Sequence, residues 1–407
     1  MRIIQVNKFN YLRGGAEKYF LEISRALVDA GHEVAVFSMH HPKNWTGAWN
    51  KYFVSRISFN EAKLRDYFLM PGRIIYSLEA KRKFAKLVRD FKPDIIHIHN
   101  IYHQISPSIL SVAKKNKIPV IMHVHDYKLI CPNYKLYTNG QVCYRCLGQR
   151  YCQAVAYKCF RGSYLASALM TAEMYFHHKI IKIYENTIKH YIAPSNFIVS
   201  IFSEFSYPTE NFSVLHNFID DKFLRGDINF TTDDYLLYYG RLSDEKGIPT
   251  LINALAHVKD KKLKLIIAGD GPALDSLKKE AWSLNFGKRV GFVGAKYGDE
   301  LNDLIKRAKA VIIPSVWLEN MPFVLLESLA LGKVVIASKI GGMPEIIDDT
   351  KNGFLFAPGD DRDLAKKIEA LDELDLRKIA LAARESVAHL TIDKHLAALL
   401  LIYKKFS

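Results

Sequence analysis

Two glutamates in the second half of the chain are placed where a carboxylate could bind a ligand. Glu319 follows the apolar run Val311–Pro314, which predicts a buried strand that runs into a loop. Glu327 comes after seven intervening residues, in a stretch that begins near Pro322 and is typical of a helix. An ionised carboxylate can accept hydrogen bonds from two hydroxyls at once. The pattern therefore predicts a ligand site in an α/β protein.

Two cations precede these glutamates in a loop of the same kind. Arg241 and Lys246 follow the predicted strand Tyr235–Tyr239 and stand where the next helix begins. Positive charges together with the free N–H groups of a helix N-terminus suit a pyrophosphate. Beside a pyrophosphate, Glu327 could accept from a ribose diol, and Glu319 would face the cleft between two domains.

The first half of the chain carries two further candidates at the carboxyl ends of predicted strands. Gly14 and Gly15 follow the strand Ile3–Val6 and open a helix, where free N–H groups suit a phosphate. His125 comes directly after the strand Pro119–Val124, so it is a candidate ligand contact. A hydrogen bond from this histidine to a neighbouring loop is the alternative.

A third predicted strand, Pro93–Asn100, contains His97 and His99. The two histidines alternate with isoleucines and therefore share one face of the strand. We expect them to be structural rather than to bind a ligand.

Both halves alternate between short apolar runs and helical stretches joined by glycine-containing loops. This alternation predicts a doubly wound parallel sheet in each half. We expect an N-terminal domain over residues 1–220 and a C-terminal domain over residues 230–391, with the acidic stretch Asp220–Asp234 at the boundary. The last predicted helix, 392–407, is expected to pack back onto the first domain.

All five cysteines lie between Cys131 and Cys159. Cys143 and Cys146 have the CxxC spacing of zinc knuckles and redox pairs, and Cys152 and Cys159 could complete a four-ligand set. No histidine stands at a zinc-finger spacing. The cysteines could bind a structural zinc ion or could be free, redox-labile thiols, and the sequence does not decide between these interpretations. Neither interpretation predicts a catalytic metal.

The positive charge of the chain is concentrated in its first half. Residues 1–200 contain 29 Lys and Arg against 12 Asp and Glu, whereas residues 201–407 contain 28 against 30. The densest basic segment, Arg73–Lys92, is either a solvated helix face or a surface attracted to an anionic membrane. The apolar segment Tyr164–His190 reads as one long helix that covers the sheet or lies against a membrane. No nucleic-acid-binding motif is present.

The order and spacing of these motifs resemble a retaining glycosyltransferase of family 4, and the resemblance covers nearly the whole chain. The matching motifs are Gly14-Gly15-Ala16-Glu17, Pro93–Asn100, His125-Asp126 with Cys131-Pro132, Gly240-Arg241 with Lys246-Gly247, Gly269-Asp270-Gly271-Pro272, Glu319 with Glu327, and Gly341-Gly342 with Pro344-Glu345. That family has the GT-B fold. The resemblance implies two Rossmann-like domains that face an interdomain cleft.

The resemblance also implies a role for each candidate residue. Arg241 and Lys246 would hold the diphosphate of a nucleotide-sugar, and Glu327 its ribose. Glu319 would contact the transferred sugar. The N-terminal domain would contribute Gly15 beside the phosphates and His125 on the donor sugar.

Catalysis in this family generally needs no metal ion or other cofactor, because cations and helix N-termini stabilise the leaving diphosphate. The resemblance implies that the acceptor attacks the donor sugar from the same face from which the nucleoside diphosphate leaves. No residue of this chain is assigned as a nucleophile. This chain departs from the family at Asn320-Met321-Pro322, where many members have a glycine-rich turn. Proline has no N–H, so one backbone donor to the sugar is lost.

The predicted function is therefore transfer of a hexose from a nucleotide-sugar to a glycan or lipid-linked glycan, in cell-surface polysaccharide biosynthesis. The absence of a signal peptide and of a membrane-spanning run favours a cytoplasmic protein, with the inner membrane face as a peripheral location. A nucleotide-sugar epimerase of the same fold is one alternative. A non-catalytic nucleotide-sugar-binding protein is another, and the intact set of charged residues argues against it.

Overall fold

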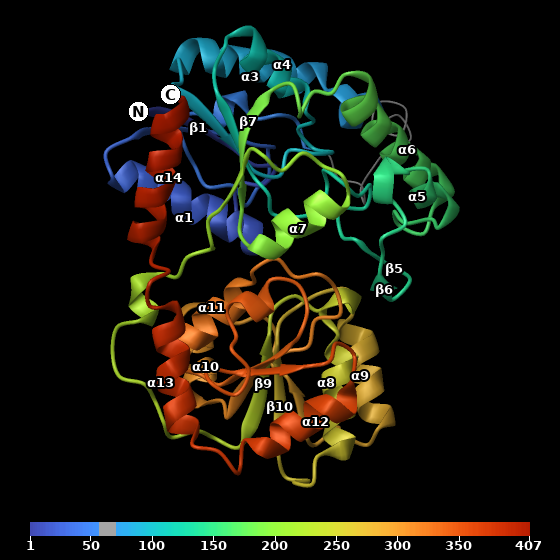
Figure 1. Cartoon of the computed structure of the whole chain (residues 1–407), viewed down its shortest axis with the longest axis vertical. Helices are drawn as coiled ribbons and strands as arrows, with labels where there is room; N and C mark the ends of the chain where they lie inside the picture. Colours follow the sequence, from blue (N-terminus) through green and yellow to red (C-terminus); the bar gives the residue numbers. More distant parts are fainter. Residues whose placement is uncertain (57–70) are drawn as a thin grey trace. The chain divides into compact units, whose positions relative to one another are not determined.

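The computed structural model describes residues 1–56 and 71–407. It divides into two compact units (Figure 1). Unit 1 consists of Met1–Leu136, Cys143–Leu215 and His395–Ser407, and unit 2 consists of Tyr137–Val142 and His216–Lys394. Apart from the short segment Tyr137–Val142, the chain enters unit 2 at His216, a few residues before the boundary expected from the sequence, and returns to unit 1 at His395.

Unit 1 is built around a six-stranded parallel sheet with the strand order β2-β1-β3-β4-β7-β8. The strands are β1 Arg2–Val6, β2 Glu33–Phe37, β3 Ile95–Ile98, β4 Val120–His123, β7 Ile188–Ala193 and β8 Phe212–Val214. The order reverses between β1 and β3. Ligands of open α/β sheets bind at such a reversal, outside the carboxyl ends of the strands.

Unit 1 contains helices between these strands and the C-terminal helix α14, and in the described residues three of them begin directly after a serine. The helices are α1 Gly15–Asp29, α3 Leu78–Phe91, α4 Ser108–Lys115, α5 Gln153–Ala156, α6 Tyr164–Tyr175, α7 Asn196–Glu204 and α14 Ile392–Phe406. The hydroxyls of Ser77, Ser163 and Ser195 accept a backbone N–H in the first turns of α3, α6 and α7. In unit 1, Tyr19 Oη of α1 lies 2.7 Å from His395 Nε2 of α14.

The prediction of a single long helix over Tyr164–His190 is wrong. Helix α6 is followed by a π-helical turn over Phe176–Ile180, and β7 already begins at Ile188. Lys182 has a φ of 45°, in the left-handed region, which a right-handed helix cannot continue.

Unit 2 is built around a second six-stranded parallel sheet, with the order β11-β10-β9-β12-β13-β14. Its strands are β9 Tyr235–Tyr239, β10 Lys264–Ala268, β11 Val290–Phe292, β12 Ala310–Ile313, β13 Val335–Ser338 and β14 Phe354–Phe356. The order reverses between β9 and β12, so a ligand crevice is expected where these two strands end. A short antiparallel hairpin, β5 Tyr137–Thr138 and β6 Gln141–Val142, also belongs to this unit.

Helices cover both faces of the unit 2 sheet. They are α8 Ile248–His257, α9 Leu274–Ser283, α10 Gly298–Arg307, α11 Phe323–Ala330, α12 Asp361–Ala370 and α13 Leu376–Val387. Alternate residues of β9 enter two separate cores: Leu236 and Tyr238 pack with α8, α9 and α12, whereas Leu237 and Tyr239 pack with α10, α11 and α13. This alternation is what a strand covered on both faces requires. The predicted fold class, two Rossmann-like sheets of the GT-B fold, is confirmed.

Candidate active site

The loops after β9 and β12 approach each other closely at the carboxyl edge of unit 2. Gly247, which opens α8, has a φ of +64°. A Cβ added there would lie 1.9 Å from the backbone oxygen of Pro314, at the end of β12. Val316 N donates to the backbone oxygen of Glu245 at 3.1 Å. Glycine is therefore needed at position 247 for two reasons, the backbone conformation and the space.

This approach brings together two residues predicted for the donor site. Lys246 Nζ lies 2.5 Å from Glu319 Oε1, and the hydroxyl of Ser315 donates to the same oxygen at 2.7 Å. Glu319 is buried, while the Lys246 side chain keeps partial exposure. The cation also lies 5.4 Å from the ring centroid of Trp317. The arrangement fixes one carboxylate oxygen and leaves the ammonium group able to bind a second anion.

The glycine turn after β13 supports Glu319 from the other side. Gly342 N donates to the backbone oxygen of Glu319 at 2.8 Å. Gly341 has a φ of +66°, and a Cβ there would lie 2.0 Å from that same oxygen. The Gly341-Gly342 pair therefore holds the backbone at Glu319 in place.

Glu327 lies on the second turn of α11 and is buried. Burial, with the nearby Glu327 charge as the next cause, raises the pKa of Tyr239 far above its usual value. Tyr239 is hydrogen-bonded through its hydroxyl to the backbone oxygen of Val324 at 2.9 Å. A buried carboxylate therefore lies near the end of β9, and its contact with a ribose stays a prediction.

The departure at Asn320-Met321-Pro322 is built into the start of α11. Pro322 is the N-cap residue, with an extended backbone. The side-chain amide of Asn217 donates to the backbone oxygen of Met321 at 2.8 Å. This segment is held by a side chain of unit 2 that the sequence pattern did not single out.

Arg241 follows β9 and is exposed, and its backbone oxygen accepts a hydrogen bond from Tyr238 Oη at 2.7 Å. Its backbone is thereby held at the edge where Lys246 lies. Four predicted site residues thus belong to unit 2: Arg241, Lys246, Glu319 and Glu327. The other two, Gly15 and His125, belong to unit 1.

Gly15 is the first residue of α1, which follows β1 after a loop over residues 7–14. Glu17 lies in the same first turn. A Cβ added at Gly14 would lie 3.6 Å from Glu17 Oε2, so this carboxyl group is close to the start of the helix. Burial raises the pKa of Glu17. A phosphate at this helix N-terminus would therefore lie close to the Glu17 carboxyl group.

His125 is half-buried and lies at the end of a hydrogen-bonded row of buried side chains. His99 Nδ1 lies 2.9 Å from His125 Nε2, and His99 Nε2 lies 2.9 Å from Gln5 Oε1. The Gln5 amide nitrogen lies 3.3 Å from His97 Nδ1, and Tyr403 Oη of α14 lies 2.6 Å from the same His97 atom. The strand histidines expected to be structural therefore hold His125 in place.

These hydrogen bonds determine which ring nitrogen of His99 and of His125 carries the hydrogen. Gln5 Oε1 can only accept, so His99 Nε2 carries its hydrogen and His99 Nδ1 accepts from His125. His125 Nε2 is then the protonated nitrogen, and Nδ1 holds the lone pair. Burial lowers the pKa of His125 to about 3, with Lys8 adding to the effect. His125 is therefore neutral at physiological pH.

Lys8, at the carboxyl end of β1, carried no motif signal in the sequence. Its Nζ lies 3.8 Å from the ring centroid of Tyr102, and burial lowers its pKa to about 8. The Tyr102 hydroxyl donates to Asp126 Oδ2, directly after His125. The reversal point of the unit 1 sheet thus holds a cation and a carboxylate beside the predicted histidine.

None of the five cysteines, Cys131, Cys143, Cys146, Cys152 and Cys159, forms a disulfide. Cys131 and Cys146 are buried, and burial raises the pKa of Cys131 to about 11, so this thiol is protonated. Across residues 1–56 and 71–407, no group of three or more His, Cys, Asp or Glu side chains is placed to hold a metal ion. Structural zinc stays a prediction that metal analysis of the purified protein can test.

The basic helix α3 is partly engaged in internal contacts. Lys81 bonds the Tyr76 hydroxyl at 3.0 Å, and Lys83 donates to the backbone oxygen of Phe53 at 2.6 Å. Arg82 and Lys86 are exposed. The solvated-face interpretation of this helix therefore applies to only part of its positive charge.

Two doubly wound parallel sheets, each with charged side chains at its carboxyl edge, define a protein of the GT-B class. A family model described as Glycosyltransferase Family 4 matches residues 13–223, and one described as Glycosyl transferases group 1 matches residues 220–385. The chain belongs to glycosyltransferase family 4 and carries a group 1 glycosyltransferase domain.

Relatives and solved structures agree with this assignment. A protein of Klebsiella pneumoniae named as an uncharacterized 42.6 kDa protein in the cps region is 27% identical over 361 residues, covering 85% of this chain and 87% of that protein. Anabaena Alr3699/HepE, solved with UDP and glucose, has a TM-score of 0.69 at 20% identity and covers 100% of both chains. WaaG, a glycosyltransferase involved in lipopolysaccharide biosynthesis, has a TM-score of 0.65 at 17% identity over 98% of this chain and 99% of that one. At these identities the structural likeness shows the fold.

Proposed function

We propose that this glycosyltransferase is a retaining hexosyltransferase that uses a nucleoside-diphosphate sugar as donor. The observation that carries the proposal is the contact of Lys246 with Glu319 where β9 and β12 end. This is the reversal point of the unit 2 sheet, where nucleotides bind in open α/β folds. The buried Glu327 on the following helix supplies the acceptor that a ribose diol needs.

In this proposal each charged group has a separate task in the transfer. Arg241 and Lys246 bind the diphosphate and stabilise the charge that develops on it as the glycosidic bond breaks. Glu327 binds the ribose, and Glu319 contacts the transferred hexose. Gly15 brings a backbone N–H towards the phosphates, and His125 contacts the donor sugar as a neutral hydrogen-bonding group.

The proposed transfer needs no metal ion, because fixed cations and helix N-termini supply the positive charge at the diphosphate. Activity in the presence of EDTA should therefore equal activity in its absence. A loss that added Mg²⁺ or Mn²⁺ restores would contradict this part of the proposal.

The proposed acceptor is a glycan or lipid-linked glycan in cell-surface polysaccharide biosynthesis, on the cytoplasmic face of a membrane. HepE was solved with UDP and glucose, which supports a nucleotide-sugar donor carrying a hexose. The named role of WaaG supports a surface glycan. The net positive charge of residues 1–200 supports an anionic membrane surface as partner of this half.

The proposal is tested by measuring nucleoside diphosphate release from a panel of nucleotide-sugars with and without glycan acceptors. Release that requires the acceptor, with the α-configuration of the donor kept in the product, is the expected result. Conversion of the sugar without an acceptor would instead show an epimerase. Donor binding without turnover across the panel would show a binding protein.

A further inference from the structure

Helix α6 and the π-helical turn after it are apolar on nearly every side. Over Tyr164–Ile180 the acidic residue is Glu173, which is buried and lies 2.7 Å from Lys128 Nζ. Ser167, Met170 and Met174 face the interior of unit 1. A helix that is apolar all round is normally buried in a protein core or placed in a membrane.

Helix α6 nevertheless has one exposed side. Leu165 is 85% exposed, Tyr164 is 57% exposed and Ile180 is 71% exposed. Ala168 and Ala172 are exposed between them, and positions 165, 168 and 172 fall on one side at helical spacing. A charged or polar side chain would normally occupy such positions on a helix that faces water.

Cations stand at both ends of this exposed side. Lys158 and Arg161 are exposed before α6, and Lys179 and Lys182 are exposed at its other end. Lys158 Nζ lies 4.4 Å from the ring centroid of Tyr164. The chain has no Asp or Glu between Asp126 and Glu173. We call these four cations, together with Tyr164, Leu165, Ala168, Ala172 and Ile180, the α6 surface.

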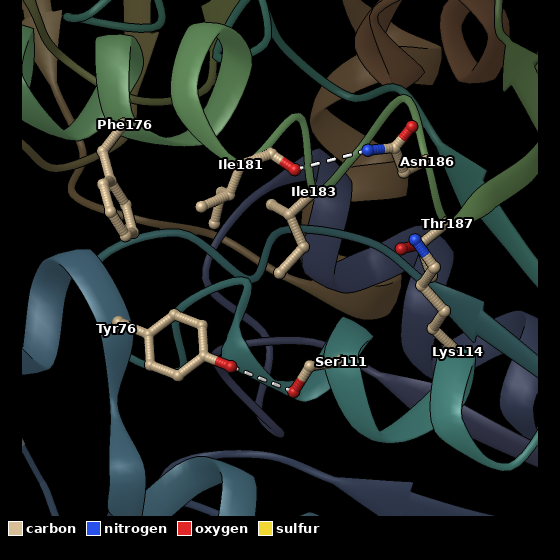
Figure 2. Close-up of a pocket in the computed structure, with 8 residues that line it drawn as sticks. All are labelled: Tyr76, Ser111, Lys114, Phe176, Ile181, Ile183, Asn186 and Thr187. Atoms are coloured by element: carbon tan, nitrogen blue, oxygen red, sulfur yellow. Dashed lines mark hydrogen bonds between the residues drawn. The ribbon is translucent and has the colours of Figure 1, made fainter.

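A pocket of about 360 Å³ opens at the C-terminal end of α6 (Figure 2). Its apolar walls include Phe176, Ile181, Ile183 and the ring of Tyr76. The Tyr76 hydroxyl is turned to Ser111, 3.1 Å away. The predicted site residues are not among those that line the pocket. Ser111, Lys114, Asn186 and Thr187 complete its lining. Ile181 follows Ile180 of the α6 surface directly, so the pocket adjoins that surface and is separate from the predicted active site.

We propose that the α6 surface inserts into the headgroup region of an anionic lipid bilayer, with the pocket taking part of a lipid chain. Apolar and aromatic side chains enter the interface, and the flanking cations meet the anionic headgroups. In the described residues no helix is long and apolar enough to cross a membrane. Tyr164–Ile180 has 17 positions, fewer than the roughly 20 that a span requires, so α6 would lie in the plane of the interface.

This inference deepens the proposed function, because it names the surface that would bring the enzyme to a lipid-linked acceptor. It differs from the hypothesis that α3 meets the membrane, because two α3 lysines bond within the unit. Membrane binding needs no turnover. Vesicle binding without transferase activity would leave the α6 inference standing and overturn the proposed function.

The test is sedimentation of the full chain with phosphatidylcholine vesicles, with and without phosphatidylglycerol, at two salt concentrations. We expect binding only with phosphatidylglycerol, and weaker binding at high salt. Leu165→Ser should weaken it by about tenfold. Lys158→Gln with Arg161→Gln should weaken it by about fivefold for each charge removed.

Matched controls separate the α6 surface from general charge and general hydrophobicity. Arg82→Gln with Lys86→Gln removes two exposed charges from α3, and Leu381→Ser removes an exposed leucine from α13. Both should leave vesicle binding unchanged. All the changed side chains are exposed, so melting temperatures should match that of the parent protein.

Two results would overturn the inference. One is vesicle binding that Leu165→Ser leaves unchanged or that the α3 control reduces equally. The other is a dimer in solution, measured by light scattering without vesicles, that Leu165→Ser converts to a monomer. The second result would assign the α6 surface to a second copy of this chain.

Discussion

Lys246 Nζ and Glu319 Oε1 lie 2.5 Å apart although 73 positions separate the two residues in the sequence. Each charge therefore partly neutralises the other before a donor binds. The loss of Glu319 should release the ammonium group for the diphosphate, whereas the loss of Lys246 leaves a buried carboxylate without its cation. The two residues should consequently respond to substitution in opposite ways.

Lys246→Ala should weaken nucleoside diphosphate binding by about 10–100-fold, because a charge-assisted hydrogen bond is worth roughly 1.5–3 kcal/mol. Glu319→Gln should leave that binding unchanged or tighter while transfer of the hexose falls. Isothermal titration with the diphosphate and initial rates with the nucleotide-sugar measure the two effects. The exposed ion-pair lysine Lys351 provides the matched control, and Lys351→Ala should change neither. Equal losses of diphosphate affinity in Lys246→Ala and Glu319→Gln would contradict the assigned roles.

Glu327→Gln tests the ribose contact. The parent protein should bind a nucleoside diphosphate about tenfold or more tightly than its 2′-deoxy analogue, because the deoxy form loses a hydrogen bond to a buried carboxylate. In Glu327→Gln this preference should shrink markedly. Competition binding with both nucleotides gives the ratio for each protein. A ratio that stays the same in the variant would place the ribose elsewhere.

Gly247→Ala tests the close approach of the β9 and β12 loops. The new Cβ would overlap the Pro314 oxygen, and an alanine at a φ of +64° is also strained, so unfolding free energy should fall by about 2–5 kcal/mol. Gly294 has a φ of +72° and open space around its Cβ position. Gly294→Ala therefore carries only the conformational term, about 1–2 kcal/mol. Urea denaturation of both variants gives the two values, and equal losses would show that the overlap relaxes without cost.

The His99–His125 hydrogen bond predicts the protonation of His125 in the resting protein. Nitrogen NMR of histidine-labelled protein should show His125 as a neutral ring protonated on Nε2 from pH 8 down to pH 5, because its pKa is lowered to about 3. A spectrum that shows His125 protonated on Nδ1 would mean that the Gln5 amide is rotated by about 180°. The donors and acceptors of the hydrogen bonds among Gln5, His99 and His125 would then be exchanged. A His125 that titrates near pH 6.5 would show that the pKa of this histidine is not lowered.

The sequence predicted the strands and the types of residue at the site, but not which of them touch. Glu319 and Lys246 could each be assigned to a loop after a strand, because apolar runs followed by glycine mark such loops. Their contact depends on β9 lying beside β12, where Val311 pairs with Leu237, and that neighbourhood is a property of the strand order. Sequence motifs do not show which strands lie side by side in a sheet.

The histidine chain was hidden for a similar reason. The alternation of His97 and His99 with isoleucines predicted a shared face, but Gln5 and Tyr403 come from a strand and a helix far away in the sequence. The exposed side of α6 could not be predicted either, because a buried helix and an interfacial helix have the same apolar composition. Lys8 carried no signal, since a lone lysine after a strand is common.

His123 offers a test of how the buried histidines limit stability at low pH. Its ring is fully buried, and both ring nitrogens have no hydrogen-bond partner within the described residues. Burial holds its pKa well below 6.5, with His125, His99, His97 and His395 adding to the effect. An unfolded histidine titrates near 6.5, so the unfolded chain binds more protons than the folded chain below that pH. Stability therefore falls as the pH decreases from about 6.5 towards the folded pKa.

His123→Leu replaces the ring by an apolar side chain of similar size, so stability at pH 7 should be equal or slightly higher. Between pH 7 and pH 5.5, the unfolding free energy of His123→Leu should fall by about 1 kcal/mol less than that of the parent protein. Glu17 and Asp126, whose pKa values are raised, act in the opposite sense but are present in both proteins. Urea denaturation at the two pH values measures the difference. An unchanged pH dependence would mean that His123 already carries a proton in the folded chain.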